Sequence, residues 1–304
     1  MKYWSEFQSN KIVKKVDYRK KHNGKIYPFV DSTIYTFDIE TSSFLTLGKK
    51  VIPGCEYSNL TKKAQEQSMP HGTMYVWMFG VGDEVYYGRT WDEFKEFLNR
   101  LEKHSDHLKI VHVHNLAFEF QFLKGEFDFA EVTARKSYKV MTALMKDYNI
   151  LFKCTYFMTN CSLAQIPKVF GLKTKKMIGD LDYDLIRHSE TPLSEKELGY
   201  CEHDCLVLYE YLKKECEEYG NVGQIPTTST GKVRRELKKK IARDYDYKNK
   251  TRRAINIEPH IYNLLIDSFA RRIYSFKLDS HKWDFRWCWF LGFYKFVSVC
   301  NGYT

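Results

Sequence analysis

Short apolar runs are spread along the first two thirds of the chain, and most are bounded by polar or turn-forming residues. Runs of this length and composition predict β-strands. The strands expected from this pattern lie at residues 34–39, 74–81, 84–87 and 110–114. Gly82 and Asp83 separate the second run from the third, so these two runs are predicted to form a β-hairpin. Residues 127–157 alternate apolar and polar positions, which favours further antiparallel strands.

Helical spacing of apolar residues marks the other predicted elements. The helices expected from it lie at residues 91–101, from residue 117 onward, at 163–170 and at 194–219. Gly171 suits the C-cap of the third helix, and Ser194 with Glu197 forms a capping box at the start of the fourth. Residues 46–72 mix Gly, Pro, Ser, Lys and Gln without steady periodicity and are predicted to form a long surface loop.

Strands followed by helices, with a hairpin at one edge, indicate an α/β or α+β domain built on a mixed sheet. We expect a polar N-terminal lead at residues 1–30, a main domain at 31–220 and a basic segment at 221–304. Residues 232–253 of that segment hold about eight of the net positive charges of the chain. A solvated helix face and a nucleic-acid contact fit this stretch about equally well.

Net charge and composition narrow the class of partner. The 304 residues carry a formal net charge of +10, which suggests a polyanion such as nucleic acid. Aromatic residues make up 16% of the chain, enough for a core and for surfaces that stack on bases. The 8 cysteines include no Cys-x-x-Cys pair and are interpreted as reduced thiols. The N-terminus lacks a signal-peptide pattern and no segment suits a bilayer span, so we predict a cytoplasmic protein without a membrane partner.

Two carboxylates, Asp38 and Glu40, stand at the end of the first apolar run on either side of Ile39. Alternate residues of a strand share a face, so both should project to the same side. Two acids at the end of a buried strand repel each other unless a cation lies between them, and Mg²⁺ is bound by such oxygen ligands. Considered alone, Asp-x-Glu is more often a solvated strand end.

A second acidic position follows the strand at 110–114. Asn115 leads into a helix that carries Glu119, and the Asn115 side chain suits an N-cap or a contact with a sugar or phosphate. Phe118 could stack on a base, although this residue considered alone is more typical of a core aromatic.

A third group, Tyr200 and Asp204, lies four residues apart on the capped helix and hence on one face. The same face carries Cys201, Leu208 and Tyr211 and is mostly apolar, so a carboxylate there needs a partner such as a metal ion. The Tyr200 phenol, one turn away, could orient an attacking water. The spacing is common by chance, and a tyrosine packed on a helix is the default interpretation.

Taken together, the order Asp-x-Glu, then Glu119, then Tyr-x-x-x-Asp resembles the three motifs of the DEDDy 3′–5′ exonucleases. More narrowly, the chain resembles the exonuclease domain of protein-primed family B DNA polymerases, the type found in phages and linear plasmids. The segments that carry this resemblance are FDIETSS, HNLAFEFQFL, CSLAQIPKVFGL, GDLDYD, TPLSEKELGYCEHD and IPTTSTGKVRR. They span about residues 12–240 and imply a ribonuclease-H-like mixed sheet with flanking helices.

The resemblance implies a role for each acidic group. Asp38, Glu40, Glu119 and Asp204 would hold two divalent ions, Mg²⁺ or Mn²⁺, and Tyr200 would position the nucleophilic water. Two cations about 4 Å apart can activate water and stabilise the leaving 3′ oxygen. The residues implied to guide the 3′ end of a single strand are Thr41, Asn115, Phe118, Ser162 and Leu163. The implied partners are a single-stranded 3′ end, primer-template DNA and a terminal priming protein, in the host cytoplasm if the chain is phage-encoded.

The basic segment adds a second expected contact with DNA. Lys232, Arg234 and Arg235 are predicted to hold phosphates, with binding that weakens as salt rises.

The chain departs from the family pattern in three places. Glu119 stands where the family usually has Asp, and its extra methylene shifts the carboxylate by about 1.5 Å. Ile178 stands where a Lys is usual, and both changes bear on the rate of exonuclease hydrolysis. Tyr274 to Phe276 resembles the approach to the first polymerase motif, but Lys277 stands where a metal-binding Asp is expected. We therefore expect no template-directed polymerisation by this chain alone.

The leading hypothesis is the N-terminal part of a protein-primed family B DNA polymerase, which carries a proofreading exonuclease domain and binds DNA. The first alternative is a self-standing DEDDy exonuclease that acts on DNA or RNA ends. The second is a catalytically weak DNA-binding module that assists a polymerase. Metal-dependent release of nucleotides separates the first two hypotheses from the third.

Overall fold

The computed structural model describes residues 1–8, 21–22, 25–26, 29–104, 107–174, 185–246 and 251–252. The chain divides into two compact units, Met1–Arg235 and Glu236–Thr304. The predictions made for Ile178, for Lys277 and for the tail after it lie outside the described residues. Of the second unit, the structure describes the end of α7 (Ser229–Asp244) and a short antiparallel pair, β12 (Tyr245–Asp246) and β13 (Thr251–Arg252).

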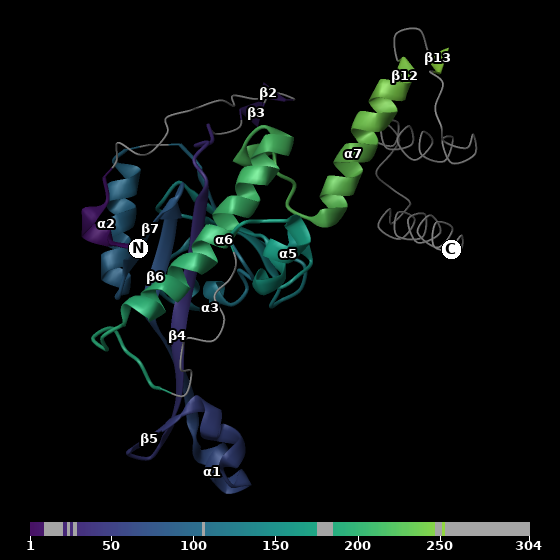
Figure 1. Cartoon of the computed structure of the whole chain (residues 1–304). Helices are drawn as coiled ribbons and strands as arrows, with labels where there is room; N and C mark the ends of the chain where they lie inside the picture. Colours follow the sequence, from purple (N-terminus) through teal and green to yellow (C-terminus); the bar gives the residue numbers. More distant parts are fainter. Residues whose placement is uncertain are drawn as a thin grey trace. The chain divides into compact units, whose positions relative to one another are not determined.

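A nine-stranded mixed sheet forms the centre of the first unit, in the order β1-β7-β6-β4-β8-β11-β10-β9, with β5 paired to β4 (Figure 1). Its strands are β1 (Lys2–Tyr3), β4 (Tyr35–Leu47), β5 (Lys50–Pro53), β6 (Met69–Val81), β7 (Glu84–Gly88), β8 (Lys109–Val113), β9 (Phe129–Ala134), β10 (Val140–Met145) and β11 (Ile150–Cys154). The pairs β1/β7, β4/β8 and β8/β11 are parallel and the other pairs are antiparallel. A separate antiparallel pair is formed by β2 (Lys21–His22) and β3 (Lys25–Ile26). The predicted fold class, a ribonuclease-H-like mixed sheet with flanking helices, is confirmed.

Helices follow the strands much as the apolar spacing predicts. Among the described residues of the first unit, the α-helices that precede α7 are α1 (Lys62–Gln67), α2 (Trp91–Glu102), α3 (Glu119–Glu126), α4 (Tyr156–Thr159), α5 (Ile166–Phe170) and α6 (Glu195–Tyr219). Short 3-10 turns are η1 (Trp4–Glu6), η3 (Gly54–Asn59), η4 (Leu163–Gln165) and η5 (Val222–Gln224). The expected helix at 163–170 is thus split into η4 and α5. The capping box at Ser194 is confirmed, with the Ser194 side chain accepting a hydrogen bond from the Glu197 amide.

One face of the sheet is covered by α2. The predicted hairpin of β6 and β7 is present, and Gly82 in its turn adopts φ +64°, a conformation that costs glycine little. Helix α2 begins at a Thr90 capping box and buries Phe94 and Phe97 completely. Phe94 stacks on Phe37 of β4 with ring centroids 5.1 Å apart, so the first predicted strand and the first predicted helix share one aromatic core.

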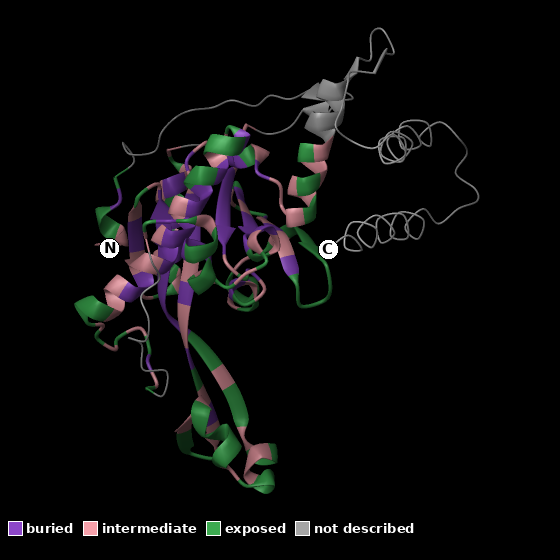
Figure 2. Cartoon of the chain, turned by 45° about the vertical axis from the view of Figure 1, so that its right-hand side comes forward, coloured by how far each residue is buried: buried purple, intermediate pink, exposed green. Residues whose placement is uncertain are grey.

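The opposite face of the sheet is covered by α6, which crosses β4 and β6 (Figure 1). On β6, Trp77 and Phe79 belong to the core beneath α2, whereas Val76 and Met78 pack against Cys201 and its neighbours on α6. This alternation follows from the two-residue period of a strand. Figure 2 shows the central strands and the inner side of α6 as buried. Up to the register shift after Glu40, the even-numbered residues of β4, which include both motif acids, therefore face α6.

The prediction of a long surface loop at 46–72 is wrong. Strands β4 and β6 continue beyond the body of the sheet, and β5, η3 and α1 fold at their far end, as both views show (Figures 1 and 2). We call residues 43–72 the arm. The two-residue turn between β4 and β5 contains Gly48 at φ +58°. In β6, Pro70, His71 and Gly72 are residues typical of turns, yet they form a strand because they pair in register with β4.

Candidate metal centre

Strand β4 places Asp38 and Glu40 on the face that α6 covers. Their partners on β6 are Met78 and Val76, and the register shifts just after Glu40, at a bulge. Bulges are frequent beside functional sites, where they re-aim side chains. On the other side β4 runs parallel to β8, with Phe37 opposite Val113. The carboxyl end of β8 and the turn that follows it therefore lie next to Asp38.

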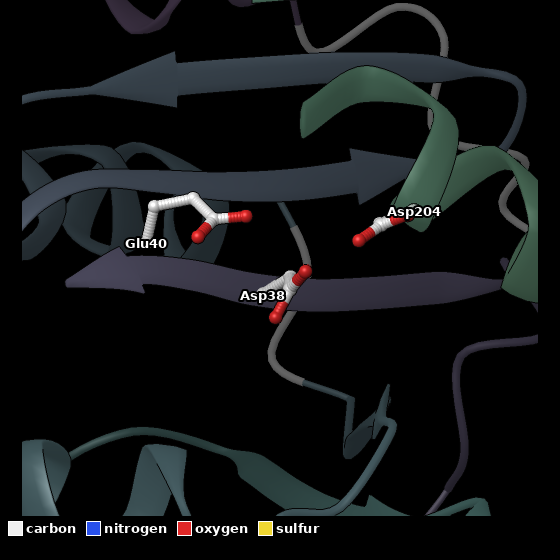
Figure 3. A group of neighbouring side chains, drawn as sticks. All are labelled: Asp38, Glu40 and Asp204. Carbon is white, nitrogen blue, oxygen red and sulfur yellow. The ribbon is translucent and has the colours of Figure 1, made fainter. Parts of the chain in front are cut away.

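Helix α6 brings Asp204 to the same place. One carboxylate oxygen from each of Asp38, Glu40 and Asp204 lies within 4.8 Å of the other two, and Figure 3 shows the three side chains pointing toward one another. Asp204 is buried, while the two strand acids are half-buried. The prediction that Asp38 and Glu40 share a face is confirmed, and the helix supplies the third carboxylate across from them.

Glu119, the first residue of α3, joins this group from the turn after β8. It is 3% exposed, and its Oε2 has no hydrogen-bond partner among the described residues. Burial raises the pKa of the Glu119 carboxyl well above its usual range, and the negative charge of Asp38 raises the pKa further. Glu119 also shares a hydrogen bond with Asp38. Three acids from β4 and α6 thus converge, with Glu119 beside Asp38 and Glu40, and ionising the whole group is costly unless a cation compensates the repulsion.

The donor set fits a hard divalent cation. Carboxylate oxygens suit Mg²⁺ and Mn²⁺, whereas thiolates would favour softer metals. Cys201 and Cys205 flank the acids on α6, but burial, reinforced by the carboxylate charges, raises the pKa of both thiols and keeps them neutral. Within the described part of the chain, the three-carboxylate group is the one cluster of His, Cys, Asp or Glu with metal-ligand spacing.

Tyr200 lies one helical turn before Asp204 and is 7% exposed. It belongs to the buried cluster that Tyr75, Val76 and Met78 form between β6 and α6. The predicted shared face of Tyr200 and Asp204 is confirmed. Its assigned role, orienting water, stays a prediction.

The turn between β8 and α3 corrects two expectations. Asn115 is not the N-cap of α3, since Phe118 occupies that position, and Asn115 instead adopts φ +64° with its side chain exposed. Asparagine tolerates this left-handed conformation better than most residues. Phe118 is 44% exposed, so the interpretation as a core aromatic is wrong. The Phe118 ring contacts Phe122, with centroids 5.4 Å apart, and its other side faces solvent.

The remaining predicted contact residues lie in two places. Thr41 follows Glu40 on β4 and is half-buried. Ser162 is exposed at the start of η4, where it forms a capping box with Gln165. Leu163 is half-buried against the apolar cluster beneath α6. Their roles in guiding a strand stay predictions.

The basic residues at the start of α7 make contacts inside the protein. Lys232 Nζ lies 2.6 Å from Glu215 Oε1 and donates to the Tyr211 hydroxyl at 2.9 Å. Arg235 donates to the carbonyl and side chain of Gln224 and covers the Tyr219 ring. Arg234 is half-buried. These bonds attach the start of α7 to α6 and η5.

Sequence reasoning missed one residue that supports the centre. Arg187 is buried and pairs with Glu197 at 2.7 Å, and its amide donates to Ser42 Oγ at 2.9 Å. It therefore ties the start of α6 to β4, two residues beyond Glu40. The motif pattern gives no signal for it, because a lone arginine in a polar stretch usually lies in solvent.

Searches of known proteins give a likeness in structure alone. No protein-family model matches the sequence, and no curated protein sequence matches it.

Among the described residues, no helix combines the length and apolar character needed to cross a membrane.

Solved structures of phi29 DNA polymerase are among those that resemble this chain. One, a complex with primer-template DNA and incoming nucleotides, matches with a TM-score of 0.50 at 14% identity. A second, with single-stranded DNA, matches with a TM-score of 0.49 at 15% identity. Each match covers 69% of this chain and 35% of the polymerase chain. At this identity the likeness is one of fold: the chain shares an α/β architecture that occupies about a third of phi29 DNA polymerase.

Proposed function

We propose that this chain is a metal-dependent 3′–5′ exonuclease module of the type that protein-primed family B DNA polymerases carry. The observation that supports it most is the convergence of Asp38, Glu40 and Asp204 within 4.8 Å. The buried Glu119 beside them supports it further, since four acids without a cation would be poorly compensated. Sequence motifs and fold support the same assignment independently.

The four acids would hold Mg²⁺ or Mn²⁺, two ions in the proposed arrangement. When bound, such ions activate water and stabilise the leaving 3′ oxygen of a phosphodiester. The contribution of the chain is to fix the carboxylates. Asp38 and Glu40 are fixed by the sheet and Asp204 by a packed helix, so little reorganisation is needed on binding.

The substrate of the proposal is the unpaired 3′ end of DNA. Phe118 is exposed and offers a ring on which a base can stack, which favours single strands whose bases are free. Asn115 and Ser162 are exposed polar residues suited to sugar or phosphate oxygens, and Thr41 adjoins Glu40. Leu163 would border the terminal nucleotide. Tyr200 would orient the attacking water from its position one turn before Asp204.

The basic start of α7 is a weaker part of the proposal. Lys232, Arg234 and Arg235 are proposed to bind phosphates, but Lys232 and Arg235 already bond to Glu215 and Gln224. A phosphate would have to compete with these internal partners. In the structure, Lys232 attaches α7 to α6 through Glu215.

The wider assignment rests on the matched share of the polymerase. The chain matches 35% of phi29 DNA polymerase. We therefore also propose that it is part of a larger polymerase, and that this polymerase binds primer-template DNA and a terminal priming protein. In it, residues 31–220 form the exonuclease domain and residues 221–304 lead toward polymerase segments. The location would be the cytoplasm of a host cell.

Digestion of a single strand labelled at its 5′ end tests the proposed activity. We expect a ladder of labelled products that shortens with time in Mg²⁺ or Mn²⁺, and an intact strand in excess EDTA, because the carboxylates need the cations. A strand labelled at its 3′ end should release labelled mononucleotide at once. An intact strand under all metal conditions, with binding retained, would assign the chain to the DNA-binding alternative.

A further inference from the structure

The arm is a fixed element rather than a tether. Thr46 Oγ1 lies 2.9 Å from His71 Nε2, and the His71 ring stacks on Phe44 with centroids 5.1 Å apart, so β4 and β6 are joined through side chains as well as backbone. Gly54 packs so closely on Ser43 that a Cβ there would lie 2.8 Å from the Ser43 Cβ. η3 is therefore folded back on β4.

The base of the arm is anchored beside the acidic cluster. Ser42 Oγ accepts a hydrogen bond of 2.9 Å from the Arg187 backbone amide, and it lies 3.4 Å from the Leu185 carbonyl oxygen. The same strand, β4, carries Glu40 two residues earlier. The position of the arm is thus set by the strand that holds two of the four acids.

The arm carries unpaired positive charge. Lys49, Lys50, Lys62 and Lys63 are exposed, and among the described residues none of their side chains has an ion pair or a hydrogen bond. Four lysines against two acids, Glu56 and Glu66, leave a net charge of +2 over residues 43–72. Lysines without an acidic partner maintain a positive potential that attracts polyanions. Tyr57, 46% exposed, adds an aromatic face for stacking.

The length of the arm matches a stretch of nucleic acid. From Glu40 to Leu47, seven residues of strand at about 3.3 Å each extend roughly 23 Å. A stacked strand advances about 3.4 Å per nucleotide, so this reach corresponds to about seven nucleotides. The lysines near the far end therefore lie about seven nucleotides from the acids.

We propose that the arm binds the phosphate backbone of a single strand whose 3′ end lies at the acidic cluster. This inference rests on the proposed exonuclease function for its placement of the 3′ end. Charge complementarity selects a polyanion over a protein partner, although Val51 and Met69 are also exposed. The arm would hold the strand several nucleotides from the reacting phosphate.

The test replaces the four arm lysines with alanine and measures binding of fluorescent oligothymidylates of 4 and 20 nucleotides over a salt series in EDTA, where hydrolysis stops. A matched control replaces four other exposed lysines whose side chains form no hydrogen bond or ion pair within the described part of the chain: Lys103, Lys136, Lys139 and Lys213. Each single-stranded phosphate contact contributes about 0.7 to the salt slope, so the arm variant should lose roughly 2 to 3 units for the 20-mer. The 4-mer should bind as in the wild type, and the control should keep both slopes.

Other outcomes overturn the inference. If the salt slope of binding changes equally in the arm variant and in the control, the effect comes from the lower net charge of the protein and not from the arm. An equal loss for the 4-mer and the 20-mer would place the lysines at the cluster itself. Loss of binding to a 20-base-pair duplex, with single-strand binding retained, would assign the arm to duplex DNA. Because binding is measured without hydrolysis, an inactive wild type would refute the proposed function but leave this comparison readable.

Discussion

Asp38→Ala and Asp204→Ala should each lower the rate of 3′-end hydrolysis by about a thousand-fold or more. Each removes one of the carboxylates that meet within 4.8 Å, and bound cations supply several kcal/mol of transition-state stabilisation. A loss of about 4 kcal/mol corresponds to a thousand-fold in rate. The measurement is single-turnover release of mononucleotide from a labelled single strand in Mg²⁺ and in Mn²⁺.

The control for these variants is Asp147→Ala, which removes an exposed acid between β10 and β11. It should keep the wild-type rate. Both cluster variants should melt at or above the wild-type temperature without metal, because each relieves repulsion among the remaining acids. Hydrolysis at the control rate in either cluster variant would refute the site.

Glu119 variants should have the second-largest effect. Glu119→Gln keeps the size of the side chain but removes its charge, and we expect a rate about ten- to a hundred-fold below the wild type, the range seen when a supporting metal contact is lost. Glu119→Asp shortens the side chain by about 1.5 Å to the residue usual in the resembling family and should match or exceed the wild-type rate.

These two substitutions separate charge from packing. Glutamine has nearly the same size and shape as glutamate, so Glu119→Gln would cost nothing if Glu119 served packing alone. A Glu119→Gln rate equal to that of the wild type would therefore exclude Glu119 from the metal centre. If Glu119→Asp is the slower variant, the cluster is adapted to the longer side chain.

The sequence predicts the central fold well because local signals and burial agree there. Alternation in β4 and the Ser194 capping box place Asp38, Glu40 and Asp204 correctly, since strand period and helix phase decide which residues share a face. The motif order adds Glu119, which the structure brings beside Asp38.

Other features depend on pairing that no local pattern contains. The arm looks like a loop because Pro70 and Gly72 lower the strand propensity of β6, yet register with β4 overrides it. Asn115 has the residue type of an N-cap but lies in a left-handed turn three residues too early. The sequence predicts a solvated Lys232, but in the structure Lys232 pairs with Glu215 because α7 packs against α6.

Calorimetric titration of Mn²⁺ into the apo-protein tests the central claim most directly, because it measures cation binding without requiring hydrolysis. The wild type and Asp147→Ala should show saturable heat of binding at the same affinity. The Asp38→Ala/Asp204→Ala double variant should show none above dilution. Binding by the double variant with the wild-type affinity and stoichiometry would contradict the account, because the cations would then be held elsewhere.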